Sequence, residues 1–415
     1  SINTATEGRP MQYRTMPSTG DRLSALGLGC MRLPTTGKKK QIDRPAATRL
    51  IHKAIDAGIN YLDTAFPYHN GQSELLLGEA LQGGYRERVK LATKLPHWLV
   101  REPDDMSKLL ARQHEKLRTD QIDYYLVHMV SEQRWQTLKT LGIVEFLEQA
   151  KRQGRVGHIG FSFHGGREEF KRLVDDYDWE FVQIQYNYLD TEHQAGREGL
   201  QYAASKGLGL IVMEPLRGGN LAKTPPKEIQ RLWNRAPRHH TPVDWALRWV
   251  WNHPEVHVVL SGMTSEEQLD ENLRTVDEAE PNLLTPDELA LIDEVAAAYR
   301  TRTRAGCTGC QYCMPCPAGV DIPNCLQTLD SYSLFGNKAA HQFSYMALAM
   351  GVMDDQRKLA SQCTECGKCT EKCPQQLPIP GLLKEVSATF EGFAARLTMR
   401  LARFYLWFVR RRSIR

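Results

Sequence analysis

The sequence lacks any apolar run long enough to cross a bilayer. The longest, "FYLWFV" at Phe404–Val409, has six residues, whereas a spanning helix needs about 20. The first ten residues lack the apolar core of a secretory signal, and we interpret them as a flexible leader before a start at Met11. The net charge of +4 excludes the strong basic excess typical of nucleic-acid binding. We therefore expect a cytoplasmic protein that binds no nucleic acid.

Cysteine is nearly absent from the first three hundred residues, where Cys30 stands alone, and nine of the ten cysteines lie beyond residue 300. This distribution excludes a disulfide framework spread over the chain, and it favours metal binding in a reducing compartment. The chain of 415 residues is also too long for one ordinary core. A large α/β barrel, which takes about 250 residues, would be the exception.

Eight short β-rich runs alternate with other segments up to about residue 300, and most of the intervals show apolar residues at helical spacing, as in "AATRLIHKAIDAG". This alternation predicts a parallel sheet, and eight strands can close into a (β/α)8 barrel. Barrels of this kind place their chemistry at the carboxyl ends of the strands. The expected strands are "LGLGCM", "NYLDTA", "VKLATKL", "YYLVHM", "VGHIGFSF", "FVQIQYN", "GLIVME" and "HVVLSG".

Four polar residues lie at these carboxyl ends. Asp63 ends the second strand, with Tyr68 in the loop after it, and Lys94 and His128 end the next two strands. A nearby ammonium should lower the pKa of the Tyr68 phenol from about 10 toward neutrality, while Asp63 holds the lysine in place and cancels part of its field. We therefore expect a phenol that is poised to give a proton rather than a standing phenolate. Such a phenol can protonate a carbonyl oxygen as hydride arrives. Each residue taken alone is more often an ordinary solvated or hydrogen-bonded side chain.

These segments resemble the aldo-keto reductases. "YLDTAFPY" is similar to that family's Asp-Thr-Ala-x-x-Tyr segment, "LATK" to its lysine strand and "DYYLVH" to its histidine strand. The resemblance covers residues 11–300 and implies a nicotinamide cofactor, bound extended without a Rossmann fold, that interconverts a small carbonyl and an alcohol. It implies that Tyr68 is the general acid, tuned by Lys94 and Asp63. His128 would orient the carbonyl.

The same resemblance implies a set of cofactor contacts, in which Ser162 and Gln183 hold the nicotinamide carboxamide and Met213 replaces a stacking aromatic ring. Many family members grip the 2′-phosphate with lysine and arginine, whereas "SGMTSEEQLDEN" carries acids. We therefore expect NADH to be favoured over NADPH, unless a cation such as Arg217 comes from another loop. The expected contacts are Ser162, Gln183, Met213, Leu216, Gly262, Thr264, Gln268, Glu271 and Asn272.

The later cysteines form two groups, "CTGCQYCMPCP" and "CTECGKCTEKCP". A zinc ribbon needs two cysteines per knuckle, whereas each group has three at two-residue intervals and a fourth before proline. The second group fits the bacterial ferredoxin pattern, in which the fourth cysteine ligates the other cluster. On that pattern one [4Fe–4S] cluster is held by Cys307, Cys310, Cys313 and Cys373, and a second by Cys363, Cys366, Cys369 and Cys316.

One spacing departs from this pattern, because two residues rather than three precede Cys316. Either Cys325 replaces it, or one cluster alone assembles; we expect two clusters, with Cys325 and Cys30 in the core. Helical segments between and after the groups resemble α-helical ferredoxin domains, and the whole chain resembles an iron–sulfur branch of the aldo-keto reductases. The expected domains are a barrel over 11–300, a dicluster ferredoxin-like domain over 301–386 and a basic amphipathic tail over 387–415.

The chain after Gly392 has seven arginines and no acid. We expect residues 393–415 to form a helix with one of two roles. It either docks on a partner or on a membrane surface, which would be that of the inner membrane, or it packs on its own barrel as a terminal helix. Hydride transfer moves two electrons and a cluster moves one, and no flavin-binding signature is visible to connect them. The clusters could pass electrons to a redox protein partner or only hold the C-terminal segment on the barrel. Alternatively, the protein is an electron-transfer or scaffold subunit whose barrel is not the catalytic centre.

Overall fold

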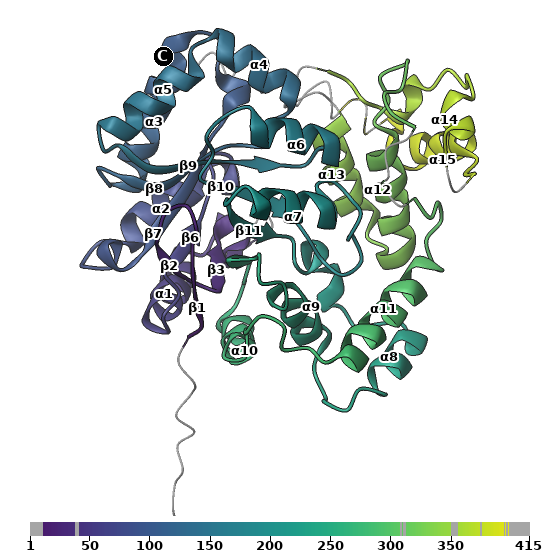
Figure 1. Cartoon of the computed structure of the whole chain (residues 1–415), viewed down its shortest axis with the longest axis horizontal. Coiled ribbons are helices and arrows are strands. Elements are labelled where there is room, and N and C mark those ends of the chain that lie inside the picture. Colours follow the sequence, from purple (N-terminus) through teal and green to yellow (C-terminus); the bar gives the residue numbers. More distant parts are fainter. Residues whose placement is uncertain are drawn as a thin grey trace, which may run out of the picture.

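The computed structural model describes residues 11–37, 41–307, 309, 313–349, 356–373, 376–393, 395 and 397. Within these ranges the chain forms a closed barrel and a helical C-terminal segment beside it (Figure 1). The α/β fold predicted from the alternating pattern is therefore confirmed. Most of the predicted basic tail and Cys310 lie outside the described residues. No helix in the described ranges is both long and apolar enough to cross a membrane.

The barrel consists of eight parallel strands, and each overlaps one of the runs that the sequence predicted, although β8 begins two residues before its run. Consecutive strands are neighbours, and β12 pairs with β3 to close the ring. All their carboxyl ends therefore meet at one rim. The strands are β3 (Leu26–Gly29), β6 (Tyr61–Asp63), β7 (Lys90–Leu95), β8 (Ile122–Val127), β9 (Val156–Phe163), β10 (Phe181–Gln185), β11 (Gly209–Met213) and β12 (Val258–Ser261).

Helices cover the outside of the barrel and bury their apolar faces against the strands. Side-chain caps mark several of their starts; Asp43, for example, accepts a hydrogen bond of 3.1 Å from the Ala46 amide at the start of α1. The helices are α1 (Arg44–Asp56), α2 (Gln72–Ala80), α3 (Pro103–Leu117), α4 (Glu132–Thr140), α5 (Ile143–Arg152), α6 (Arg167–Asp175), α7 (Gly196–Ser205), α8 (Lys227–Trp233), α9 (Pro242–Trp251), α10 (Glu266–Val276) and α11 (Pro286–Arg300).

A short antiparallel hairpin, β1 (Tyr13–Thr15) and β2 (Arg22–Ser24), lies at the amino-terminal end of the barrel. Its neighbourhood contributes Met16 and Leu23 to the cluster of buried side chains inside the barrel, which also contains Tyr61 and Phe181. This end is therefore filled with apolar side chains, and polar chemistry is left to the carboxyl rim. A second small hairpin pairs β4 (Thr35–Thr36) with β5 (Gln41–Ile42). The 3-10 turns are η1 (Cys30–Arg32), η2 (Tyr68–Gly71), η3 (Arg86–Arg88), η4 (His97–Leu99), η5 (Arg217–Ala222) and η6 (Ala360–Gln362).

The C-terminal segment has a hydrophobic core of its own, built around Leu326, Val386 and Phe390, and the described cysteines beyond residue 300 except Cys366 either belong to that core or pack against it. In Figure 1, α12 and α13 lie on the side toward the barrel, and α14 and α15 lie on the outer side. Because α15 continues to Phe390, this core crosses the expected boundary between residues 386 and 387. The helices are α12 (Ile322–Phe335), α13 (Lys338–Ala349), α14 (Lys368–Glu371) and α15 (Ile379–Phe390).

Candidate active site at the barrel rim and cysteine cavity

The carboxyl rim brings together the four polar residues that the sequence singled out. Asp63 is the last residue of β6, Lys94 the next-to-last of β7, and His128 directly follows β8. Tyr68 begins η2, in the loop after β6. Three neighbouring strands thus present their ends to one volume, as expected for parallel strands in a closed barrel.

A buried ion pair forms the base of this site. Lys94 Nζ donates to both carboxylate oxygens of Asp63, at 2.7 and 2.6 Å, and to the Thr64 carbonyl oxygen at 2.7 Å. The exposed fractions of the two side chains are 1% and 3%. All three ammonium hydrogens therefore have acceptors, and each charge is matched by the other, as burial of an ion pair requires.

The Tyr68 ring lies over this pair. Lys94 Nζ is 5.2 Å from its centroid, and the His128 ring meets it edge-on at 6.2 Å between centroids. Burial raises the pKa of the Tyr68 phenol well above 10, and the negative charges of Asp63 and Glu214 raise it further. The direction is opposite to the one expected from the sequence, because Lys94 is already neutralised by Asp63. Tyr68 consequently stays protonated at neutral pH.

The loop that carries Tyr68 is held by a left-handed turn. His69 and Asn70 have φ values of 50° and 55°, and Gly71 follows with 84°. Such values suit glycine and asparagine better than most residues. The Leu33 amide donates to His69 Nε2 at 3.1 Å, which ties this loop to the chain after β3. Tyr68 is therefore positioned by its own turn and by an anchor on a neighbouring segment.

His128 is buried as a neutral imidazole. Burial, with the positive charge of Lys94, lowers its pKa well below 6.5. Its Nδ1 is buried and has no hydrogen-bond partner in the described part of the chain. Trp98, in η4, packs on the ring at 5.2 Å between centroids. The sequence analysis did not select Trp98, although its place in "KLPHW", shortly after Lys94, was the available signal.

The residues expected to hold the nicotinamide ring also come together. Gln183 pairs in register with Ser162 across β10 and β9. Its amide Nε2 lies 3.6 Å from the Met213 sulfur. Gln183 Oε1 is buried and unpartnered within the described ranges, and Ser162 Oγ accepts from the Met129 amide at 2.8 Å. An open buried acceptor beside a hydroxyl fits a carboxamide ligand, because an unpaired buried polar atom is costly otherwise.

The expected adenosine contacts lie on the loop after β12 and on α10. The Thr264 amide donates to Gln268 Oε1 at 2.8 Å, and the buried Asn272 donates to Ser261 Oγ at 2.8 Å. Asn272 is therefore committed to holding the loop on its strand. Gly262, in the loop, and Glu271, in α10, are exposed. The half-buried Leu216 lies on another segment, just before η5.

Two acids of this region, Asp270 and Glu266, and the alternative cation are already paired. Lys53 of α1 binds Asp270 at 2.8 Å and Glu266 at 3.4 Å. Arg217 forms a largely buried ion pair with Asp190 at 3.0 Å. Arg217 is therefore engaged away from the loop after β12, where it was considered as a cation for the 2′-phosphate.

The cysteines of the second group line a cavity in the C-terminal segment, together with residues of the first group. No three histidine, cysteine or acidic side chains in the described ranges converge on one point, as a single metal ion would require. The sulfurs surround a space instead, which fits a cluster whose four irons each take one thiolate. Lys368 and Lys372 also line the space and offset negative charge there. The cysteines that line it are Cys313, Cys316, Cys363, Cys366 and Cys369.

The remaining cysteines are placed differently. The Cys307 amide donates to Asp330 at 3.3 Å, and the same carboxylate accepts from the amides of Ala305 and Gly306. Asp330 therefore fixes the chain at the start of the first group. Cys325 is fully buried in the core of the C-terminal segment, and Cys373 is partly buried against that core.

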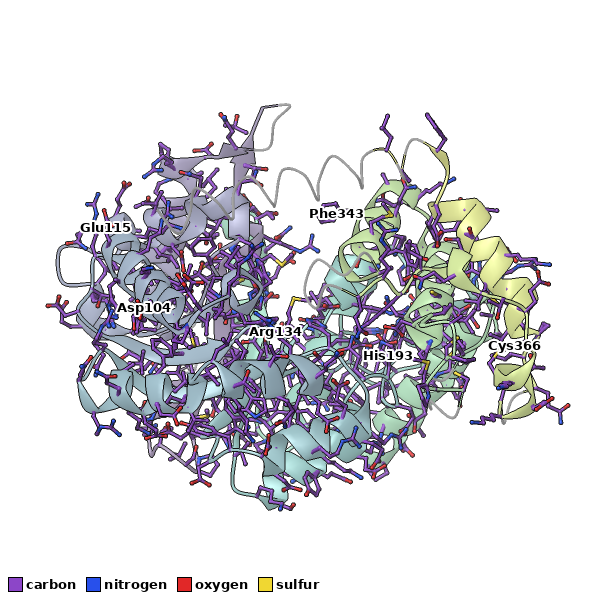
Figure 2. The ribbon with its side chains drawn as sticks, turned by 90° about the horizontal axis from the view of Figure 1, so that it is seen from above. Asp104, Glu115, Arg134, His193, Phe343 and Cys366 are labelled. Atoms are coloured by element: carbon purple, nitrogen blue, oxygen red, sulfur yellow. The ribbon has the colours of Figure 1, made fainter. Side chains whose placement is uncertain are left out.

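The C-terminal segment contacts the barrel at the loops of the carboxyl rim. Asp190, in the loop after β10, accepts from Arg217 at 3.0 Å and from Gln327 of α12 at 3.1 Å. A Cβ on Gly309 would lie 3.0 Å from His193 Nδ1, so the first cysteine group packs on the same loop. Figure 2 shows His193 between the barrel and the C-terminal helices, and Cys366 on the outer side. The first group is therefore the one nearer to the barrel.

Comparison with known proteins agrees with both parts of the chain. The model of the aldo/keto reductase family matches residues 25–297, and that of a 4Fe-4S dicluster domain matches residues 306–377. An uncharacterised oxidoreductase of Bacillus subtilis is 31% identical over 233 residues, which are 51% of this chain and 68% of that protein. A probable voltage-gated potassium channel subunit beta of Oryza sativa subsp. japonica is 26% identical over 346 residues, 71% of this chain and 99% of that protein.

Among solved structures, the holo form of an aldo-keto reductase from Bacillus halodurans superposes with a TM-score of 0.58 and 25% identity. The match covers 69% of this chain and 96% of that one. A putative aldo-keto reductase from Pseudomonas matches with a TM-score of 0.52 at 23% identity, which bears on the fold alone. The chain therefore belongs to the aldo/keto reductase family and carries a C-terminal 4Fe-4S dicluster domain.

Proposed function

We propose that the protein is a nicotinamide-dependent reductase of a small carbonyl compound, with Tyr68 as the proton donor. The observation that carries this proposal is the buried Lys94–Asp63 ion pair beneath the Tyr68 ring, with His128 beside it, at the carboxyl rim. A barrel that had lost its chemistry would gain nothing from two buried charges, which are costly to desolvate. Membership of an oxidoreductase family supports the same reaction class.

Each residue of the site has a distinct part in this reaction. A reduced nicotinamide supplies the hydride when it is bound, and Ser162, Gln183 and Met213 would hold its ring. Tyr68 donates its phenolic proton to the carbonyl oxygen and so quenches the negative charge that develops there. The neutral His128 imidazole orients that oxygen.

The Lys94–Asp63 ion pair has no net charge, and it lies beside a Tyr68 phenol that is protonated before the reaction. As the phenol loses its proton, the ammonium 5.2 Å from the ring centroid favours the phenolate that forms. Asp63 offsets part of that attraction in both states, and burial keeps the phenol protonated until a carbonyl oxygen accepts the proton. The pair therefore stabilises the reacting state more than the ground state.

We favour NADH over NADPH as the cofactor. The start of α10 carries Glu266, Glu267 and Asp270, and the cations beside them, Lys53 and Arg49, already face Glu266 or Asp270. A 2′-phosphate needs a free cation or a fork of donors. Glu267 forms no ion pair with any residue that the structure describes, and its charge would repel a 2′-phosphate. This repulsion supports NADH, which lacks the phosphate.

For the C-terminal domain we propose two [4Fe–4S] clusters, which carry one electron each when bound. Cys363, Cys366, Cys369 and Cys316 would hold the one in the cysteine-lined cavity. The other would be held by Cys307, Cys310, Cys313 and Cys373, next to the barrel loop that contains His193; Cys313 also borders the cysteine-lined cavity and would lie between the two clusters. This placement supports electron exchange with a redox protein partner, as well as a role in holding the domain on the rim.

Replacement of Tyr68 by phenylalanine tests the proposed function. With NADH and a panel of aldehydes and ketones, we expect Tyr68→Phe to lose about 100-fold or more in kcat/KM, because a positioned acid contributes about 10²–10⁴-fold. Binding of NADH, followed by its fluorescence, should change little. The measurement requires anaerobically purified protein with its iron content determined.

Tyr61→Phe is the matched control, because the Tyr61 hydroxyl is buried and has no hydrogen-bond partner in the described residues. Tyr61 is the first residue of β6, the strand before the Tyr68 loop, and its side chain belongs to the interior cluster of the barrel. We expect this variant to keep its activity. Equal activity of Tyr68→Phe and Tyr61→Phe would contradict the assignment of Tyr68 as the acid.

A further inference from the structure

An arginine that the sequence analysis did not select crosses the rim where a nicotinamide cofactor would lie. Arg32 is the last residue of η1, directly after β3, and its side chain is exposed. A Cβ built on Gly262 would lie 3.2–3.4 Å from the Arg32 side-chain carbons, and one on Gly218 would lie 3.6 Å from Arg32 Nη2. The side chain therefore runs past the loop after β12 and ends beside η5.

This guanidinium is left without a partner. Arg32 forms no ion pair or hydrogen bond with any residue that the structure describes, whereas neighbouring cations of the rim are matched. Arg217 is paired with Asp190, and Lys53 with Asp270. Glu214 is near enough for the charge of Arg32 to act on its pKa, but it lies beyond ion-pair distance. An arginine in such a position has donors free for an anionic ligand.

The position of Arg32 indicates which part of a dinucleotide it would meet. The expected nicotinamide contacts, Gln183 and Met213, lie on β10 and β11, and the expected adenosine contact Gln268 lies on α10. A cofactor extended between them passes Gly262 and η5, the two places that Arg32 touches. The middle of a dinucleotide is its pyrophosphate.

The backbone on both sides of Arg32 is suited to such a ligand. Gly262 presents no side chain toward the arginine stem, and any Cβ there would crowd it at 3.2 Å. Gly218 and Gly219 have φ values of 66° and 89°, so the chain of η5 turns where only glycine is unstrained. The missing side chain at Gly262 leaves room for the Arg32 stem, and a Cβ on Gly219 would meet nothing within 4 Å, so η5 leaves space for a phosphate beside the guanidinium. A guanidinium presents its donors as a planar fork that matches phosphate oxygens.

We infer that Arg32 binds the pyrophosphate of the nicotinamide dinucleotide and supplies the positive charge that the loop after β12 lacks. This inference rests on the proposed function, because it assigns a binding residue to the same site. It also separates two properties of the cofactor. Arg32 contributes to affinity for NADH and NADPH alike, and the acids of α10 set the preference between them.

The test is a fluorescence titration of iron-loaded protein with NADH and NADPH, which measures binding rather than turnover. We expect Arg32→Ala to raise Kd about 10- to 100-fold for both nucleotides, equivalent to about 1.4–2.8 kcal/mol at 1.4 kcal/mol per tenfold change. The ratio of the two Kd values should stay unchanged. Arg32→Lys keeps the charge and loses the planar fork of donors. For each nucleotide, its Kd should therefore fall between that of the wild type and that of Arg32→Ala.

Arg49→Ala is the control for loss of an exposed positive charge near the same rim. Arg49 lies 3.8 Å from Glu266, and its side chain is 64% exposed; we expect an unchanged Kd for NADH, which has no 2′-phosphate to meet this acid. Kd values of Arg32→Ala equal to those of the wild type would overturn the inference, and a loss confined to NADPH would do so as well, since Arg32 would then contact the 2′-phosphate. Failure of the wild-type protein to bind either nucleotide would instead refute the proposed function, and the inference with it.

Discussion

Tyr68 shows how far a single residue's chemistry depends on charges that the sequence does not place. The sequence indicated an ammonium near the phenol, and from that alone a lowered pKa follows. In the structure both oxygens of Asp63 and the Thr64 carbonyl surround the Lys94 ammonium. Its field at Tyr68 is largely cancelled, so burial decides and raises the pKa of the phenol. The spacing of the four residues was predictable, but the balance between two buried charges was not.

The pH dependence of carbonyl reduction follows from these directions. Tyr68 must be protonated to act, and its raised pKa keeps it so below about pH 10. His128 acts as a neutral ring, and its lowered pKa keeps it neutral above about pH 6. We therefore expect kcat/KM for carbonyl reduction to be flat between about pH 6 and 9, measured at constant ionic strength. A decline with a midpoint between about pH 7 and 9 would show that Lys94 lowers the pKa of Tyr68 after all.

Residues outside the sequence motif mark the limit of prediction at this scale. Trp98 packs on His128, and Arg32 reaches Gly262 from the opposite end of the chain's barrel region. Neither contact is local in sequence. Trp98 and His128 follow different strands, β7 and β8, and Arg32 meets Gly262 because β3 and β12 become neighbours when the barrel closes. Asn272 was expected as a cofactor contact, and this stays a prediction; its Nδ2 donates to Ser261 Oγ.

At the scale of elements, the helices behind the site hold it through buried polar contacts. Glu74 of α2 is fully buried; it accepts from Thr93 of β7 at 2.8 Å and from Gln113 of α3 at 2.9 Å. Gln113 also donates to the Lys94 carbonyl oxygen at 3.0 Å. The helices α2 and α3 therefore fix the backbone of the lysine strand, and their close packing matters for the rim.

That packing depends on the absence of a side chain at Gly78. A Cβ on Gly78 would lie 2.1 Å from the Lys116 carbonyl oxygen and 2.8 Å from the Leu117 carbonyl carbon. Because backbone atoms cannot rotate away, Gly78→Ala must push α2 from α3, and we expect a loss of about 1–3 kcal/mol in unfolding free energy. Denaturant unfolding of the barrel measures it.

The comparison is Gly381→Ala in α15, where a Cβ would meet nothing within 4 Å. Alanine is the better helix former by up to about 1 kcal/mol, so this substitution should stabilise its own domain. Opposite signs for the two substitutions are the expected outcome. A neutral Gly78→Ala would show that α2 and α3 can separate without cost.

The pattern of elements was more predictable than their contacts. All eight barrel strands follow from apolar runs, since each lies between helices and must be buried on both faces. The hairpin of β1 and β2, with three residues in each strand, carries no such signal in its polar, loop-like sequence. The end of the C-terminal domain was equally hard to place, because α15 continues apolar spacing past residue 386 to Phe390.

At the scale of the whole molecule, two hydrophobic cores meet through polar contacts at the rim and through Leu334 and Phe335 of α12, which pack on the barrel core. The core of the C-terminal segment is small, and most of the described cysteines beyond residue 300 pack against it. A core of this size gives limited stability by itself, so bound clusters would supply much of its folding free energy. The barrel has a large core of its own. Loss of a cluster should therefore weaken the C-terminal domain first, and affect the rim through Gln327 and Asp190.

The number of clusters and the identity of one ligand can be decided together. Cys316 lines the cysteine cavity with Cys363, Cys366 and Cys369. Cys325, the alternative ligand, lies in the core, where its sulfur is 3.9 Å from Tyr345 Oη. We expect about eight iron atoms per chain in the wild-type protein, since two clusters hold four each. Cys316→Ala should lower this number by about half.

Cys325→Ala is the matched variant, because it removes a thiol of the same domain that does not line the cavity. We expect it to keep the full iron content and to cost only the small packing loss of one buried sulfur. The reverse result, with iron lost from Cys325→Ala and kept in Cys316→Ala, would make Cys325 the ligand and require the first turn of α12 to move toward the cavity. About four iron atoms in the wild-type protein would mean that one cluster alone assembles, and the shorter spacing before Cys316 would then be the physical reason.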